Sequence, residues 1–192
     1  MGLQPLRKHL VGRLTHHTNP GWTYFITTKP TQNISVFQVK EVVDIVVTKM
    51  LEYRSKGNYL LHDFVLLPNH LHAILNPTDS VTLEKCLQLI KGGGSHEIHK
   101  VRDNKMQIWQ SGFHKSRVTD SIDYKKKSDY IRFNPVVAKL VERPELWPFS
   151  SASGQFECDP IPQGLKPITL GSTNVGPKGP TPNPLSRLAE AR

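Results

Sequence analysis

Hydrophobic positions along the chain follow two periods, and the change from one period to the other divides the sequence into short elements. Residues 22–28 (WTYFITT) are aromatic and β-branched, which favours a strand. Residues 36–53 place valines and a methionine at helical spacing. Residues 59–68 and 70–75 predict two further strands, because both are apolar runs and a Pro-Asn turn joins them.

The second half of the chain continues this pattern less regularly. Residues 82–90 carry apolar side chains at helical spacing, and the sequence KGGG at 91–94 predicts a break in that helix. Residues 108–118 (IWQSGFHKSRV) predict a fourth strand with an irregular stretch. The chain therefore offers four strands and two helices before its last helical segment.

A last helix is predicted to begin at Asp120 or Ser121, either of which can cap it, and to extend to about residue 141. Pro135 lies inside this pattern and predicts a stop or kink near Asn134, with a separate helical turn after it. The order β-α-β-β-α-β-α predicts an α+β fold, in which helices pack on one face of a ferredoxin-like antiparallel sheet and one helix is added at the C-terminal end.

The length of 192 residues favours one domain with appendages. We expect a basic N-terminal arm over residues 1–20, the folded domain over 21–155 and a flexible tail over 156–192. The tail is expected because its Pro, Gly, Ser and Thr content leaves few large apolar side chains for a core.

The charge balance indicates a polyanionic partner. The chain has 25 Lys and Arg against 16 Asp and Glu, a formal net charge of +9, which favours nucleic acid over a merely solubilising basic surface. Only two cysteines are present, and neither a leader pattern nor a run of membrane-spanning length is seen. These features predict a cytoplasmic protein that does not associate with membranes.

His70 and His72, in the sequence LLPNHLHAIL, are the first candidates for chemistry. Alternate residues of a strand point to the same face, so the two imidazoles can share one cation while Leu71 points into the core. An isolated His-x-His is nevertheless more often one packed histidine and one solvated histidine.

Tyr130 and Asn134 lie four residues apart, and therefore on one face of the last helix. A tyrosine hydroxyl is a possible nucleophile on phosphorus, and an amide oxygen is an acceptable ligand for a hard metal. The alternatives are an aromatic side chain that packs the helix on the sheet and an asparagine that ends the helix before proline.

The blocks LLPNHLHAIL, QLIKGGGSHEIHK, IWQSGFHKSRV, YIRFNPVVAKLV and WPFSSA occur in the order found in tyrosine-dependent HUH transposases. The sequence most closely resembles the REP-associated tyrosine transposases, over roughly residues 22–153. The resemblance implies Mg²⁺ or Mn²⁺ bound by His70, His72 and Asn134, and Tyr130 as the nucleophile. It also implies cleavage and rejoining of hairpin-flanked single-stranded DNA through a 5′-phosphotyrosine.

The sequence departs from its relatives at Arg132 and Lys139, where many relatives carry His and Gly. Tyr124 is a second tyrosine on the same helix, and it is the poorer candidate because its offset from the motif differs. The candidate DNA-binding residues are Lys91, Lys115, Arg117, Lys125, Lys126, Lys127 and Arg132.

Two other functions stay open at this point. One is a non-catalytic, structure-specific DNA-binding module that has kept the fold. The other is a metal-dependent phosphodiesterase that uses water, which would leave Tyr130 without a role. The oligomeric state is also open, and a homodimer is one alternative.

Overall fold

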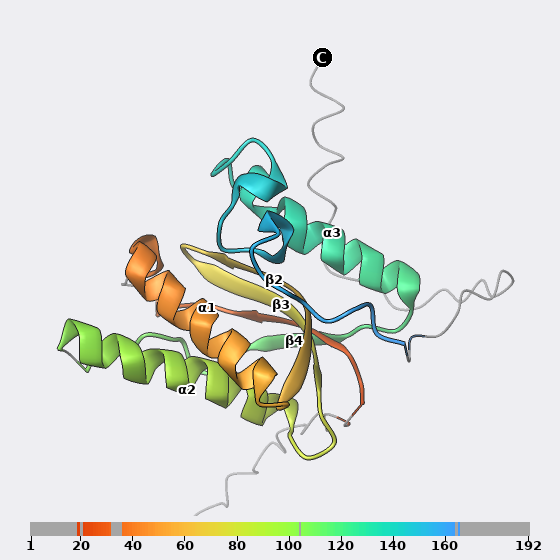
Figure 1. Cartoon of the computed structure of the whole chain (residues 1–192), viewed down its shortest axis with the longest axis horizontal. Coiled ribbons are helices and arrows are strands. Elements are labelled where there is room, and N and C mark those ends of the chain that lie inside the picture. The colour runs from red at the N-terminus through yellow and green to blue at the C-terminus, as the bar shows by residue number, and fades with distance from the viewer. Residues whose placement is uncertain (1–18, 20, 32–35, 104, 164, 166–192) are drawn as a thin grey trace, which may run out of the picture.

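The computed structural model describes residues 19, 21–31, 36–103, 105–163 and 165. It contains a four-stranded antiparallel sheet in the order β2-β3-β1-β4 (Figure 1). The strands are β1 (Tyr24–Thr28), β2 (Tyr59–Leu67), β3 (His70–Pro77) and β4 (His114–Arg117). The helices are α1 (Lys40–Ser55), α2 (Leu83–Arg102) and α3 (Ser121–Val137), with short 3-10 turns η1 (Val36–Gln38), η2 (Pro144–Leu146) and η3 (Ser151–Ser153). The α+β class and the predicted element order are confirmed.

The three helices cover both faces of the sheet. α1 and α2 lie side by side on one face, and α3 lies across β2 and β3 on the other (Figure 1). Each face has its own hydrophobic cluster: the larger lies under α1 and α2, and the smaller lies under α3. Leu71 belongs to the first and Ile74 to the second, because alternate strand residues face opposite sides.

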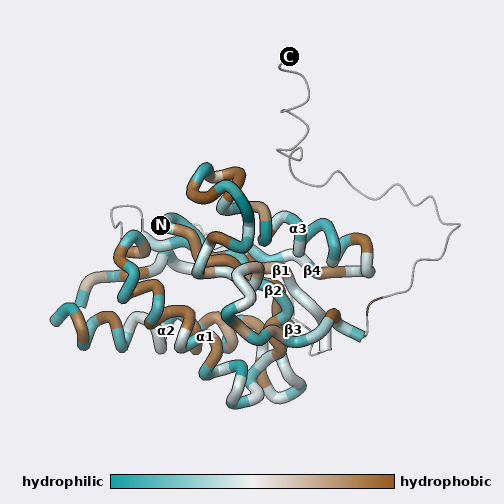
Figure 2. The backbone as a smooth tube through the Cα atoms, turned by 45° about the horizontal axis from the view of Figure 1, so that its top comes forward, coloured by the Kyte–Doolittle hydropathy of each residue, from teal (hydrophilic) through white to brown (hydrophobic). Residues whose placement is uncertain are grey.

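The apolar face of each helix accounts for these layers. Hydrophobic and hydrophilic segments alternate along α1 and α2 (Figure 2), as expected of helices that bury one side. Val42, Val46 and Met50 of α1 are completely buried. No helix in the described ranges is long and apolar enough to cross a membrane.

The prediction that KGGG ends the second helix is wrong. α2 continues through all three glycines to Arg102, and Asp103 ends it in a left-handed conformation with φ 46°. A Cβ atom on Gly93 would lie 2.7 Å from the Tyr53 hydroxyl, and one on Gly94 would lie 3.4 Å from a Val46 methyl group. The glycines therefore let α2 approach α1 closely, and this packing outweighs their low helix propensity.

The fourth strand is shorter than predicted. β4 comprises only His114–Arg117, and Trp109 makes an isolated bridge to Pro30 instead of extending the strand. Gly112 has φ 70°, which interrupts the extended run before β4. Trp109 is 5% exposed and packs on Phe37, so it belongs to the core.

The segment after α3 follows the outer edge of the sheet. The Leu66 amide donates to the Phe149 carbonyl at 2.9 Å, and the Asp159 amide donates to the Leu61 carbonyl at 2.7 Å. Leu66 and Leu61 both belong to β2, which is an edge strand of the sheet. The edge of β2 that does not face β3 would otherwise present unpaired backbone groups. The packed part of the chain therefore reaches Asp159, which lies in the range that composition assigned to the tail.

The last helix does not stop near Asn134, which was one of the two effects predicted for Pro135. α3 passes through Pro135 to Val137, and it ends where Lys139 adopts φ 58°. The Lys139 amide donates to the Val136 carbonyl and the Leu140 amide donates to the Pro135 carbonyl, both at 2.9 Å. This pair of hydrogen bonds is the Schellman motif, which usually places glycine at the left-handed position.

Replacing Lys139 with glycine should therefore stabilise the protein. Lys139→Gly removes the steric cost of a left-handed β-carbon, and we expect a gain of about 1 kcal/mol in the free energy of unfolding. Urea unfolding measures this difference, with Lys126→Gly as a control that lies in the helix interior and should lose stability. A Lys139→Gly variant less stable than the wild type would contradict the explanation of this helix end.

Candidate active site

The two histidines of β3 occupy the face of the sheet that α3 covers. β3 begins at His70 immediately after the Pro68-Asn69 turn, so His70 and His72 point the same way and Leu71 points to the opposite core. The centroids of the two imidazole rings lie 4.5 Å apart. The predicted same-face arrangement of the histidines is therefore present.

His72 is held by β1. Its Nδ1 lies 2.8 Å from the Thr27 hydroxyl, which is directly opposite in the strand register, and its ring stacks on Phe25 at 5.2 Å. Its Nε2 is buried and has no hydrogen-bond partner. Burial, together with neighbouring His70, lowers the pKa of His72 to about 3. The ring is therefore neutral at physiological pH, and the Thr27 contact suits a tautomer with its free lone pair on Nε2.

His70 is held by Asn69 and faces α3. Its Nδ1 lies 2.5 Å from the side-chain oxygen of Asn69. Burial lowers the pKa of His70, and a hydrogen bond with the Asn134 side chain opposes this effect. The Asn134 amide thus reaches the histidine pair from the helix.

Tyr130 completes the group from the turn of α3 that precedes Asn134. Its ring centroid lies 5.1 Å from that of His72 and 6.0 Å from that of Phe25, and the side chain is 45% exposed. The ring therefore contacts the sheet while the residue stays partly exposed to solvent, a combination that suits a nucleophile. The four side chains that the resemblance implied are therefore neighbours, although they come from two separate elements.

Tyr124 occupies a different environment from Tyr130. It is 8% exposed, contacts the His62 ring edge-on and belongs to the cluster under α3. Burial raises the pKa of the Tyr124 hydroxyl to about 12. Tyr124 is therefore a packing residue, which agrees with its rank as the poorer candidate.

The residues present fit a divalent cation. Nothing in the described ranges brings three His, Cys, Asp or Glu side chains together as a metal-binding group, so a site here would consist of two imidazoles and an amide. Neutral imidazole nitrogens and amide oxygens are acceptable ligands for divalent ions. The buried, unpartnered Nε2 of His72 is the observation that most favours such an ion.

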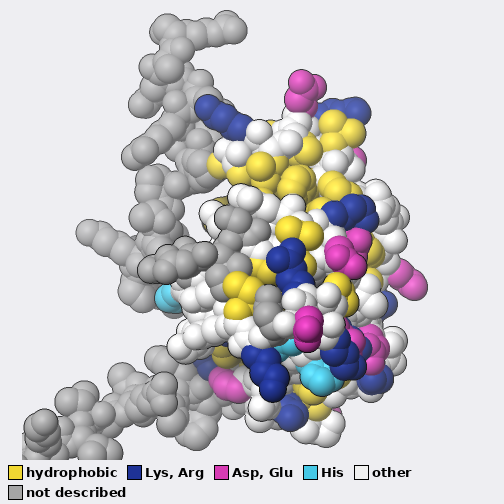
Figure 3. All heavy atoms as spheres, turned by 90° about the vertical axis from the view of Figure 1, so that its left-hand side faces the viewer, with side chains coloured by type: hydrophobic (Ala, Val, Ile, Leu, Met, Phe, Trp, Pro, Cys, Tyr) yellow, Lys and Arg dark blue, Asp and Glu magenta, His cyan; other side chains and the backbone are white. Residues whose placement is uncertain are grey.

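The basic charge is unevenly distributed along the chain. Residues outside the described ranges contain seven Lys and Arg and one Glu, so they carry +6 of the net charge of +9 and the described residues carry +3. On the face that includes the ends of α1 and α2, basic and acidic side chains are interspersed (Figure 3). Ion pairs on α1 also offset basic side chains, as where Lys49 pairs with Glu52 at 2.8 Å. That face does not present a single basic field.

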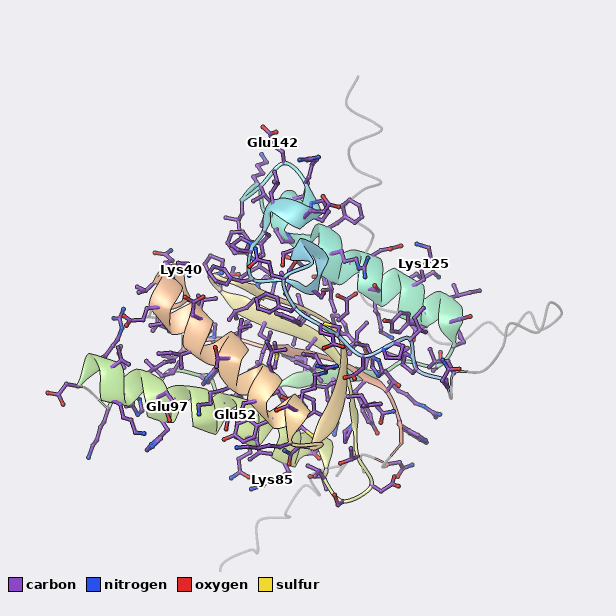
Figure 4. The ribbon with its side chains drawn as sticks, in the orientation of Figure 1. Lys40, Glu52, Lys85, Glu97, Lys125 and Glu142 are labelled. Atoms are coloured by element: carbon purple, nitrogen blue, oxygen red, sulfur yellow. The ribbon has the colours of Figure 1, made fainter. Side chains whose placement is uncertain are left out.

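Four of the candidate DNA-binding residues lie on α3 with Tyr130. Lys125 projects into solvent (Figure 4) and pairs with Asp129 at 2.7 Å. Lys126 is exposed, and Lys127 pairs with Asp123 at 2.6 Å. Arg132 is 52% exposed and contacts Asp63. These four cations form the basic part of the helix that carries the candidate nucleophile.

The other three candidates lie on the opposite face of the sheet. Lys115 is opposite Ile26 and Arg117 is opposite Tyr24, and both partners belong to the core under α1 and α2. Lys91 of α2 donates to the Gln110 carbonyl at 2.7 Å and to the Gly112 carbonyl at 2.8 Å. The structure therefore does not bring these three cations together with Tyr130.

The residues that support the histidines could not be recognised in the sequence. Phe25 and Thr27 of β1 and Asn69 of the turn before β3 orient the two rings, and their positions in the sequence carried no sign of this role. His114 of β4 is opposite Thr27, so it lies on the same face of the sheet as His72. His72, Thr27 and His114 therefore form a row across β3, β1 and β4, which only the strand register reveals.

Comparison with known proteins identifies the family of the chain. The family of IS200-like transposases matches residues 22–134. A REP-associated tyrosine transposase of Escherichia coli strain K12 is 30% identical over 120 residues, which cover 62% of this chain and 67% of that protein.

One solved structure resembles this fold. A REP-associated tyrosine transposase bound to a REP hairpin has a TM-score of 0.62 and 21% identity, covering 93% of this chain and all of that one. A putative transposase from Deinococcus radiodurans has a TM-score of 0.45 and 16% identity, covering 66% of this chain and 95% of that one. The resemblance found in the sequence is confirmed: the chain belongs to the IS200-like transposase family and is a homologue of the REP-associated tyrosine transposases.

Proposed function

We propose that this ferredoxin-like domain cleaves and rejoins hairpin-flanked single-stranded DNA, with Tyr130 as the nucleophile. The observation that carries the proposal is the contact between Tyr130 and His72, whose ring centroids are 5.1 Å apart while the His72 Nε2 has no partner. Family membership supports the reaction class.

The reaction follows from the chemistry of a side-chain nucleophile. The Tyr130 oxygen forms a bond to the 5′ phosphate of one DNA segment, and the bond from that phosphorus to the 3′ oxygen of the preceding nucleotide breaks. The hydroxyl proton of Tyr130 is lost, and the departing 3′ oxygen takes up a proton. The phosphotyrosine conserves the phosphodiester, so attack by another 3′ hydroxyl can join a new end without ATP.

His70, His72 and Asn134 would hold Mg²⁺ or Mn²⁺ beside the phosphate. When bound, the ion would polarise the phosphate and reduce its charge during attack. Thr27 and Asn69 orient the imidazoles, and Phe25 packs against both His72 and Tyr130. This support keeps the nucleophile and the ligands in one arrangement before DNA arrives.

The proposed substrate is supported by charge and by a relative. Lys125, Lys126, Lys127 and Arg132 lie on the helix of Tyr130 and could follow a phosphate backbone. The structural neighbour bound to a REP hairpin suggests a hairpin as the recognised element. Tyr130→Phe separates this proposal from a water-using phosphodiesterase, because such an enzyme would still cleave DNA without the tyrosine hydroxyl. The wild type separates it from a binding module, because a binding module would form no adduct.

Removing the hydroxyl of Tyr130 should abolish the covalent intermediate. With end-labelled, hairpin-flanked oligonucleotides and Mn²⁺, we expect Tyr130→Phe to form no protein-linked band on a denaturing gel and to retain its affinity on a native gel. Tyr124→Phe is the matched control, because Tyr124 is buried on the same helix, and it should still form the adduct. An adduct formed by Tyr130→Phe would contradict the assignment.

Removing His72 should weaken metal binding in the absence of DNA. Titration calorimetry with Mn²⁺ should show about a tenfold or larger loss of affinity in His72→Ala, because one of the proposed ligands is lost. His96→Ala is the control, since His96 is an exposed imidazole of α2. Equal Mn²⁺ affinity in the wild type and His72→Ala would place the metal elsewhere.

A further inference from the structure

Asp63 is a buried carboxyl group at the point where three segments meet. It lies on β2, its side chain is completely buried, and it points toward α3. Ser128 of α3 donates to its Oδ2 at 2.5 Å, and Arg132 of the same helix donates to that oxygen at 3.3 Å. Ser151 of η3 donates to its other oxygen.

Stability alone gives a poor reason for this arrangement. Burying a carboxyl group carries a desolvation cost that hydrogen bonds only offset, and apolar residues of similar size often stabilise such a position equally well. Hydrogen bonds supply something that apolar packing does not, namely a fixed direction and distance. Asp63 fixes two turns of α3 and one turn of η3 to the same point on β2.

These contacts lie on the flank of α3 opposite to Tyr130. Ser128 and Arg132 are one helical turn apart, and Tyr130 lies midway between them in sequence. At about 100° per residue, Tyr130 therefore points to the far side of the helix from that pair. The helix is pinned along its β2 flank, while its other flank carries Tyr130 over His72 of β3.

We propose that Asp63 is a positioning residue that sets the rotation of α3, and thereby the height of the Tyr130 hydroxyl over the histidine pair. This inference rests on the proposed role of Tyr130 as the nucleophile. The hydrogen bond from Ser151 to Asp63 adds the segment after α3 to this arrangement. A residue outside α3 and the sheet then helps to determine the position of Tyr130.

A small rotation of the helix is sufficient for a large effect. Because a helix with its side chains is about 10 Å wide, turning α3 by about 10° around the Asp63 contacts moves the opposite flank by about 2 Å. Misplacing a reacting group by about 1 Å can slow a reaction by a factor of about 100. Asp63 contacts neither Tyr130 nor the histidines in the contacts described, so it acts through Ser128 and Arg132.

The first test compares two carboxyl groups at β2: Asp63, which belongs to the strand, and Asp159, which contacts it from the C-terminal segment. Asp63→Asn keeps the shape of the side chain but weakens the contacts to α3. Asp159→Asn is the matched control, because the Asp159 side chain accepts hydrogen bonds from Arg54 of α1 and from the Leu61 amide of β2 rather than from α3. With a hairpin-flanked oligonucleotide and Mn²⁺, we expect adduct formation to slow about tenfold to a hundredfold in Asp63→Asn and to stay unchanged in Asp159→Asn.

Ser151 provides a second variant if Asp63→Asn fails to fold. Ser151→Ala should slow adduct formation without loss of DNA affinity, and Ser151→Thr should restore the rate because it keeps the hydroxyl. Ser153→Ala is the control, since Ser153 donates to the Ser150 carbonyl in the same turn. Rates in Asp63→Asn and Ser151→Ala equal to those of their controls would overturn the proposal.

A readout without DNA separates this inference from the proposed function. Nuclear Overhauser contacts between the ring protons of Tyr130 and those of Phe25 and His72 report the position of the tyrosine directly. We expect them to weaken in Asp63→Asn and to persist in Asp159→Asn. If the wild type forms no adduct, the proposed reaction fails and these contacts decide the positioning role alone: unchanged contacts in Asp63→Asn overturn it, and lost contacts support it.

Discussion

The packing of α3 across β2 and β3 is the interaction on which the candidate site depends. The sheet supplies His70 and His72 on one face, but Tyr130 and Asn134 reach them only because α3 lies over that face. Ile131 is completely buried beneath the helix, between the flank that contacts Asp63 and the flank that carries Tyr130. Anything that moves α3 on the sheet therefore changes the relation between the two halves of the site. The opposite face, with α1 and α2, supports the sheet without contributing a residue to this group.

Burial of the imidazoles gives the site its chemical character. A buried His72 loses hydration that would favour its charged form, so its pKa falls and the ring stays neutral. The unpartnered Nε2 carries a cost in the absence of a ligand, because an unsatisfied buried polar atom loses its bonds to water. Contacts with Thr27 and Phe25 hold the His72 ring in this buried position. The same features that make His72 unfavourable as a packing residue make it suitable as a metal ligand.

Most of the elements could be predicted because they depend on local patterns, and the structure brings the four candidate site residues close together. Strand alternation placed His70 and His72 on one face, and the resemblance assigned Tyr130 and Asn134. The remaining features depend on contacts between distant segments. The glycines of α2 were wrongly predicted to break the helix, because only the close packing of α1 against α2 explains them. Lys115 was wrongly grouped with the site, because the sheet face to which it points is set by the register of β4 with β1. Asp63 gave no local signal, since its partners lie 65 to 88 residues away along the chain.

The most direct test of the account is to identify the amino acid that carries the DNA. The covalent complex, formed on a hairpin-flanked oligonucleotide with Mn²⁺, would be digested with protease and nuclease and sequenced by mass spectrometry. We expect a nucleotide joined through its 5′ phosphate to Tyr130. A nucleotide on Tyr124, or cleaved DNA with no modified peptide, would contradict it.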